Sequence, residues 1–115
     1  VIYEDGVGVI DGQDQIEDDF IGTVTTISMS NGFFEGDSPV ILGVAESEKD
    51  KIKASCRATK DAVEDGLNLG EVIEEICEEL DGEGGGHNIA AGAKFPRDKK
   101  DEFITMVEEK VMERV

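Results

Sequence analysis

Two short segments of the sequence carry groups that could bind an anion. One is Gly84-Gly85-Gly86-His87, in which three residues without a Cβ are followed by an imidazole. Glycines accept positive φ and let a ligand approach the main chain, and the imidazole can donate a hydrogen bond. The other pairs the hydroxyl of Ser55 with the guanidinium of Arg57. A guanidinium makes charge-assisted hydrogen bonds to phosphate, so the chemistry these residues suggest is phosphate binding.

The element around the glycine segment decides how such a site would work. We expect Gly84 to Gly86 to form a turn and the small residues His87 to Ala91 to form the first turns of a helix. Free N–H groups would then gather at the positive end of the helix dipole, which suits a phosphate. A flexible turn with no ligand is the alternative that this pattern leaves open.

The stretch Lys51–Arg57 alternates between apolar and polar residues, which predicts a strand with one buried face. Ile52, Ala54 and Cys56 lie on one face, and the other face carries three of the eleven basic residues, at positions 51, 53 and 57. Without other evidence, an ordinary solvated strand face is the favoured explanation of this row. Beside an anion-binding turn, the same row would form one wall of a ligand site.

The total charge limits what the chain can bind. There are 28 acidic and 11 basic residues, which gives a formal net charge of −17. Such a surface repels nucleic acid at long range, so unspecific binding to a phosphate backbone is not expected. A nucleotide ligand therefore needs a local cationic or N–H-rich site. Adaptation to a salty cytoplasm would also explain the acidity.

With 115 residues, the chain has the length of one domain with one core. It contains no apolar run of the roughly 20 residues that a membrane helix needs. It starts at Val1 in a strand-like pattern, so we expect an excised part of a longer protein, with N-terminal processing as the alternative. Cys56 and Cys77 form no CxxC pattern, which favours buried reduced thiols in a cytosolic protein and leaves a disulfide open.

Hydrophobic periodicity predicts alternating strands and helices in the first part of the chain. Residues 1–11 read as two short strands around Asp5-Gly6, a hairpin signal, or as one bulged strand. From Ile16 to about Ser30, Phe20, Val24 and Ile27 recur at helical spacing, although three threonines keep a strand open. After a loop over residues 33–38, residues 40–45 are continuously apolar, as in a strand covered on both faces.

The second part of the chain predicts more helix. A short helical turn is expected at residues 60–63, and Asn68 with Glu71 resembles a capping box that opens a helix to Leu80. A strand over residues 91–95 and a terminal helix over residues 98–115 complete the pattern. The expected fold is a single α/β domain with a mixed sheet of about five strands packed with three to four helices.

Two motifs carry a family resemblance. The segment Gly84–Gly92, GGGHNIAAG, resembles the GGGHxxAAG motif of the DHH-associated domain, the C-terminal half of DHH-family phosphoesterases. About 30 residues upstream, Ser55-Cys56-Arg57 resembles the Ser-x-Arg strand of that domain. The resemblance covers roughly residues 39–115 well and the first 38 loosely, and points to an archaeal RecJ-like protein.

The resemblance implies roles for particular residues. Arg57 would contact a substrate phosphate with support from Ser55, while Gly84, Gly85 and Gly86 would offer backbone N–H groups. His87 would contact a phosphate or a terminal nucleotide, and Asn88 is a weaker candidate. The chain itself would thus be the substrate-binding domain, spanning residues 1–115.

In this family the catalytic work belongs to a separate N-terminal DHH domain that binds manganese. The sequence contains one histidine and no Asp-His-His motif, so it cannot build a two-metal centre. We therefore expect no catalytic residues, no bound metal and no hydrolase activity in this chain alone. The resemblance assigns manganese-dependent phosphodiesterase or exonuclease activity to a cytoplasmic parent protein.

The expected partners are the DHH domain of the same protein and a single-stranded nucleic acid, short oligonucleotide or nucleotide. Low aromatic content and negative charge favour short or terminal substrates. The alternative is a non-catalytic module for nucleic-acid binding or oligomerisation, like the related domain at the C-terminus of alanyl-tRNA synthetases. A homodimer is left open, and a membrane partner is not expected.

Overall fold

A computed structural model of the chain describes residues 2–4, 7–13, 20–30 and 39–114. These residues form six strands and four α-helices, and the predicted α/β fold with one mixed sheet is confirmed. The strands are β1 (Ile2–Glu4), β2 (Gly8–Asp11), β3 (Val40–Glu46), β4 (Lys51–Ala58), β5 (Glu83–Gly86) and β6 (Ala90–Pro96). The helices are α1 (Ile21–Ser30), α2 (Lys60–Glu64), α3 (Leu69–Glu79) and α4 (Lys100–Arg114), with a 3₁₀ turn η2 (Arg97–Lys99) before α4.

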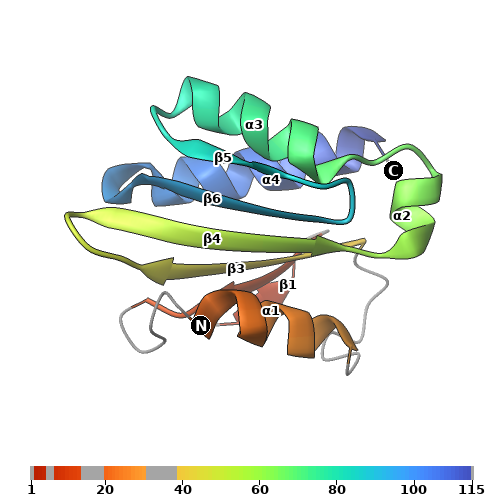
Figure 1. The fold of residues 1–115 in the computed structure, drawn as a ribbon, viewed down its shortest axis with the longest axis horizontal. Helices are drawn as coiled ribbons and strands as arrows, with labels where there is room; N and C mark the ends of the chain where they lie inside the picture. Colours follow the sequence, from red (N-terminus) through yellow and green to blue (C-terminus); the bar gives the residue numbers. More distant parts are fainter. Residues whose placement is uncertain (1, 5–6, 14–19, 31–38, 115) are drawn as a thin grey trace.

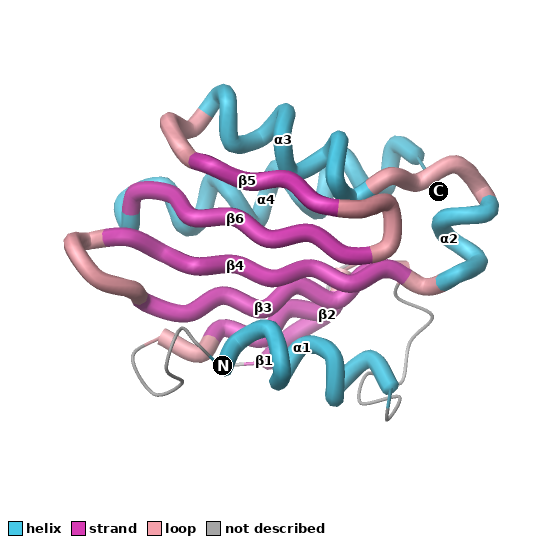
Figure 2. Tube along the Cα trace, in the orientation of Figure 1, coloured by secondary structure: helices cyan, strands magenta, loops and turns pink. Residues whose placement is uncertain are grey.

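The sheet has the strand order β1-β2-β3-β4-β6-β5 (Figure 2). All neighbouring strands are antiparallel except β2 and β3, which are parallel because α1 lies between them in the chain. The antiparallel pair of β1 and β2 confirms the predicted two strands, although the Asp5-Gly6 turn lies outside the described residues.

The helices cover the two faces of the sheet differently. In Figure 1, α1 lies in front of the sheet and α4 lies behind it, with α3 beside the β5 edge. The buried core fills the space between the sheet and the α3–α4 layer, where the rings of Phe95 and Phe103 stack with centroids 4.2 Å apart. On the opposite face, α1 packs on β3 and β4. None of the helices in the described ranges is long and apolar enough to cross a membrane.

A glycine on β3 lets α1 lie close to the sheet. A Cβ built on Gly43 would collide with Thr25 Oγ1 and lie 3.0 Å from Ile21 Cγ1. Ile21 and Thr25 are fully buried, and the Thr25 hydroxyl donates to Ile21 O over 2.7 Å. The predicted helix is confirmed over residues 21–30, but its buried side was not the predicted one, because Phe20 is 56% exposed.

The helices of the second half begin where local chemistry predicts. Thr59 accepts from Ala62 N at the start of α2, and Asn68 Oδ1 accepts from Glu71 N at the start of α3. A side-chain oxygen at these positions satisfies an N–H that has no partner inside the helix. Both predicted helices, the predicted strand over residues 91–95 and the terminal helix are therefore confirmed.

The predictions of a turn at the three glycines and of a helix after them were wrong. Gly84 to Gly86 belong to an edge strand, β5, and His87 to Ile89 connect it to β6 instead of starting a helix. The hydrogen bond from His87 N to Ala90 O, 2.8 Å long, closes this connection. All four residues of β5 pair with residues of β6, and this pairing outweighs the low strand propensity of glycine. The proposed helix N-terminus at residue 87 therefore does not exist.

Both cysteines are free and buried, as predicted. Cys56 lies on the core face of β4, and burial, with a smaller effect of Cys77, raises its pKa from 9.0 to about 12. Because the folded-state pKa lies above the unfolded value, the folded protein binds this proton more tightly than the unfolded chain. The resulting contribution to the free energy of unfolding is fully present well below pH 9. This contribution is lost as the pH rises towards 12.

We predict that the free energy of unfolding falls more steeply with pH in the wild type than in Cys56→Ala between pH 9 and 10.5. The difference in slope should approach about 1.4 kcal/mol per pH unit, the limit for one proton. Urea unfolding at a series of pH values measures it, and titration of other groups cancels between the two proteins. Equal slopes would show that Cys56 ionises as easily in the folded as in the unfolded chain.

Candidate functional site

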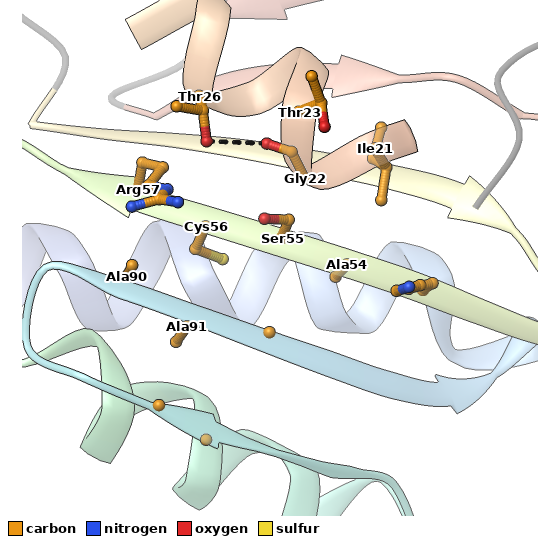
Figure 3. A pocket seen from close by; sticks show the side chains of 14 residues that line it. Ile21, Gly22, Thr23, Thr26, Ala54, Ser55, Cys56, Arg57, Ala90 and Ala91 are labelled. Atoms are coloured by element: carbon orange, nitrogen blue, oxygen red, sulfur yellow. Dashed lines mark hydrogen bonds between the residues drawn. The ribbon is translucent and has the colours of Figure 1, made fainter. Parts of the chain in front are cut away.

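A groove lies on the α1 side of the sheet, over β4, β6 and β5. Its volume is about 600 Å³, within the range of small-molecule sites. Strand residues form its floor and the first turns of α1 form one wall, as Figure 3 shows. Its small and polar lining residues include Ser55, Arg57, Gly85, Gly86, Ala90 and Gly92 from the sheet, with Gly22, Thr23 and Thr26 from α1.

Strand register explains why the floor is hollow. Gly43, Ser55, Gly92 and Gly85 are consecutive register partners across β3, β4, β6 and β5, and we call them the small-residue row. At the Gly43 end α1 fills the space above the row. Towards Gly92 and Gly85 no described helix covers it, since a Cβ on Gly85 would meet no atom within 4 Å. The exposed part of the row is the floor of the groove.

Cationic side chains flank the small-residue row on both sides. Arg57 follows Ser55 by two residues on the same face of β4, and Lys53 precedes it by two. Lys94 on β6 is the register partner of Lys53 and therefore shares this face. Two residues of a strand span about 6.6 Å, so Arg57 and Lys53 each lie about that far along β4 from Ser55. An anion with several oxygens that lies over the row is within reach of both positive charges.

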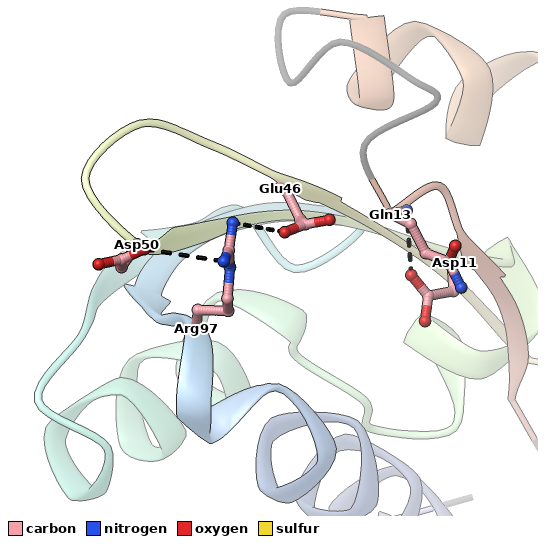
Figure 4. Close-up of polar contacts among 5 residues, drawn as sticks. All are labelled: Asp11, Gln13, Glu46, Asp50 and Arg97. Atoms are coloured by element: carbon pink, nitrogen blue, oxygen red, sulfur yellow. Dashed lines mark hydrogen bonds and ion pairs between the residues drawn. The ribbon is translucent and has the colours of Figure 1, made fainter.

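These cations differ from four others that are ion-paired, although Lys49, Lys51 and Lys60 also have no ion pair among the described residues. Within the described ranges, Lys53, Arg57 and Lys94 have no carboxylate within ion-pair distance. By contrast, Arg97 contacts Glu46 and Asp50 at the far end of the sheet (Figure 4). Lysines 99, 100 and 110 are paired as well. In a chain with a charge of −17, unpaired cations on one face leave their charge available to a ligand.

Ser55 and Arg57 come together in this groove, as the alternation of β4 predicts. Both are partly buried, and in Figure 3 the Ser55 hydroxyl and the Arg57 guanidinium lie on the side of β4 that faces α1. The hydroxyl of Thr26 already donates to Gly22 O over 2.9 Å within α1. Ser55 and Arg57 therefore offer polar side chains with unused hydrogen-bonding capacity at the floor of the groove.

The three predicted glycines do not share one role. Gly85 and Gly86 line the groove, with φ of 155° and 152°, a region that side chains rarely enter. Gly84 points the other way, because a Cβ there would lie 2.8 Å from Cys77 Sγ and 2.9 Å from Ile73 Cγ2 of α3. Gly84 is therefore a packing residue between β5 and α3.

His87 and Asn88 are exposed in the β5–β6 connection, and neither lines the groove. Their carbonyl oxygens accept the N–H groups of Gly70 and Leu69, at 3.0 Å each. These bonds satisfy the first donors of α3, and Asn68 satisfies the N–H of Glu71. The helix end nearest the glycines is thus capped by protein, and the imidazole of His87 stays in solvent near the groove's β5 end.

Sequence reasoning missed Gly92, Ala90, Lys94 and the α1 wall. Gly92 belongs to the quoted motif, but its place opposite Ser55 follows from register, which the sequence does not state. The described residues contain no group of three or more His, Cys, Asp or Glu that could hold a metal ion.

Comparison with protein families gives one match that covers most of the chain. Residues 24–113 match the DHHA1 domain. The uncharacterized protein MJ0831 of Methanocaldococcus jannaschii is 36% identical over 96 residues, which are 84% of this chain and 22% of that protein. Alanine–tRNA ligase of Bacillus pumilus is 37% identical over 78 residues, 66% of this chain and 8% of the ligase. The chain thus spans less than a quarter of these relatives.

Solved structures share the fold. The C-Ala domain of Aquifex aeolicus alanyl-tRNA synthetase superposes with a TM-score of 0.69 at 21% identity, covering 95% of this chain and 96% of that one. The DHH-domain structure of PF0399, a member of a family of ribosomal proteins, gives 0.65 at 24% identity, covering 91% and 25%. The pGpG-specific phosphodiesterase PggH of Vibrio cholerae gives 0.62 at 10% identity, covering 98% and 35%.

We predict that alanine substitutions at two glycines of the motif differ in their effect on stability. Gly84→Ala should lower the free energy of unfolding by about 1–3 kcal/mol, because its methyl group overpacks the contact with α3. Gly92→Ala should change it by less than about 0.5 kcal/mol, since its Cβ meets only Ala54 O at 3.5 Å. Urea unfolding of both variants checks this. A stable Gly84→Ala protein would contradict the packing role.

Proposed function

Because the chain belongs to the DHHA1 domain family, we propose that it is the substrate-binding domain of a DHH-type phosphoesterase and that its groove holds a phosphate of a nucleotide or nucleic-acid end. Arg57 binds the phosphate oxygens, Ser55 donates to them, and Gly85 and Gly86 let the phosphate approach the main chain. The observation that carries the proposal is the pair of unused polar side chains, Ser55 and Arg57, beside an open floor of glycines.

Charge and size support this proposal. Arg57 has no acidic partner within the described part of the chain, so binding a phosphate breaks no existing ion pair. A guanidinium and a hydroxyl donate to a phosphate with good geometry. The net charge of −17 repels polyanions elsewhere, and this limits binding to the groove. The similarity to the phosphodiesterase PggH supports the fold alone.

The longer protein would divide the work between two domains. A DHH domain would supply manganese and the hydrolytic water, and the present domain would position the phosphate in the cleft between them. Closure of one domain over the other would admit and retain the substrate. His87, exposed near the β5 end of the groove, would reach a phosphate or terminal nucleotide only in such a closed state. A cytoplasmic location agrees with this role.

We predict that Arg57→Gln weakens binding of a nucleoside 5′-monophosphate to the 115-residue chain by at least about tenfold. Loss of a charge-assisted hydrogen bond costs about 1.5–3 kcal/mol. Ser55→Ala should weaken it by a few fold, as expected for a neutral hydrogen bond. Isothermal titration calorimetry measures both.

The matched control is Lys60→Gln, which removes one exposed positive charge on α2 that does not line the groove. It should leave the affinity unchanged within about twofold. Equal affinities for wild type, Arg57→Gln and Lys60→Gln would reject the phosphate site.

A second candidate is a non-catalytic module for RNA contact or assembly. It is favoured by the 37% identity to an alanine–tRNA ligase and by the fold shared with a C-Ala domain. This function predicts binding of tRNA, or a stable dimer by light scattering, that Arg57→Gln leaves unchanged. The phosphoesterase function predicts that Arg57→Gln lowers nucleotide affinity and that the DHH-containing parent hydrolyses phosphodiesters only with manganese.

A further inference from the structure

The outer edge of the sheet, at β5, is a main-chain surface with a partner strand on one side only. β5 ends the strand order, and β6 is its neighbour on the inner side, as Figure 2 shows. In an antiparallel pair, every second residue directs its N–H and C=O away from the partner strand. Because His87 N bonds to Ala90 O, the outward residues of β5 are Gly84 and Gly86. Both are exposed, whereas Gly85 between them is partly buried.

The outward groups of β5 have no hydrogen-bond partner in the described part of the chain. There, β5 is joined by hydrogen bonds to β6 alone. The first N–H groups of α3 bond to the carbonyls of His87 and Asn88, beyond the strand. Gly86 O lies against α3, since a Cβ built on Gly70 would be 2.5 Å from it. The N–H and C=O of Gly84 are therefore the most open groups of this edge.

The sequence of β5 does little to protect this edge. Proteins commonly block an exposed edge strand with lysine, proline or a bulge, because an open edge can pair with another chain. β5 has none of these, and its one charged residue, Glu83, stands at its first position. The three glycines that follow have no side chain to obstruct an incoming strand. A short extended segment can therefore add to the sheet here by main-chain hydrogen bonds.

Three carboxylates of α3 lie on the flank of that helix next to the open edge. Cys77 marks this flank, because its Sγ would lie 2.8 Å from a Cβ built on Gly84. Glu75 marks the other flank, because it pairs with a lysine of α4. With 3.6 residues per turn, the carboxylates on the Cys77 side are Glu71, Glu74 and Glu78. All three are exposed and have no ion pair among the described residues.

These carboxylates decide which kind of strand fits the edge. They repel a nucleic-acid strand. A second copy, paired edge to edge, would bring two sets of the same carboxylates together, and like charges across an interface disfavour binding. A peptide with basic residues at alternate positions avoids both costs, because alternate side chains of a strand point to one face. Residues preceding β1 would join the sheet at its opposite edge, which favours a segment of another protein.

We propose that the β5 edge binds a short, extended, basic segment of a partner protein. Its main chain pairs with Gly84, and its Lys or Arg side chains on one face contact Glu71, Glu74 and Glu78. The phosphate groove lies on the α1 side of the sheet and α3 on the other. The peptide site is therefore separate from the groove and does not depend on the proposed function.

Three octapeptides with blocked ends test the main-chain pairing on the 115-residue chain by fluorescence anisotropy. They are an alternating Thr-Lys peptide, the same peptide with every main-chain nitrogen methylated, and an alternating Thr-Glu peptide. The Thr-Lys peptide should bind at least about fivefold more tightly than its methylated form, which has the same charge but no main-chain N–H to donate. The Thr-Glu peptide should show no binding. In ¹⁵N spectra, the Thr-Lys peptide should shift the amide of Gly84 most.

A matched pair of double variants tests the carboxylates. Glu74→Gln with Glu78→Gln should weaken binding of the Thr-Lys peptide by about threefold or more, since two exposed ion pairs are lost. The control, Glu109→Gln with Glu113→Gln, removes two exposed carboxylates at the same spacing from α4. It should change the affinity by less than about twofold, and so should Arg57→Gln in the phosphate groove.

Three results would overturn the inference, and none of them bears on the phosphate site. The first is a methylated peptide that binds as tightly as its parent, because charge alone would then explain binding. The second is equal weakening by the α3 and α4 double variants, which would remove the role of the α3 flank. The third is a dimer of the chain in light scattering that excludes the Thr-Lys peptide, because a second copy would then occupy the edge.

Discussion

The groove depends on one constraint: among the described residues, α1 is the helix that packs on this face of the sheet, and it covers only part of the face. The small-residue row, Gly43, Ser55, Gly92 and Gly85, crosses four strands in register. Where α1 lies on it, the missing Cβ of Gly43 permits close contact with Ile21 and Thr25. Beside α1, where the helix no longer covers the row, the same lack of side chains leaves a hollow of about 600 Å³. The small-residue row thus allows the close packing of α1 and also leaves space for a ligand beside it.

The opposite face of the sheet supports the floor of the hollow from behind. Its core is packed by α3 and α4, and Gly84 and Gly70 bring α3 close to β5, with a Cβ on Gly70 only 2.5 Å from Gly86 O. The backbone of Gly85 and Gly86 is thereby held from behind while its front faces the groove. Support of this kind reduces the entropy lost when a ligand binds. The glycine motif therefore combines packing residues and groove residues in adjacent positions.

Much of the fold was predictable from local pattern. The alternation of β4, the continuous apolar run of β3 and the Asn68 cap of α3 each reflect one element and its immediate neighbours. The glycine strand was not, because its conformation comes from pairing with β6 and packing against α3, both absent from local propensity. The shared strand face of Ser55 and Arg57, by contrast, was predictable, because residues two apart in a strand point the same way. That Gly84 faces α3, while Gly92 completes the floor, follows from sheet register.

The β4–β6–β5 face, and no other surface, is the one that we propose binds a phosphate-bearing ligand. The most direct measurement is a titration of the ¹⁵N-labelled chain with thymidine 5′-monophosphate, followed by amide chemical shifts. We expect the largest changes to cluster at Ser55, Arg57, Gly85, Gly86 and Gly92, which line the groove. Shifts confined to α3, α4 or the Arg97 ion-pair cluster, or no saturable shifts in the groove, would contradict this assignment.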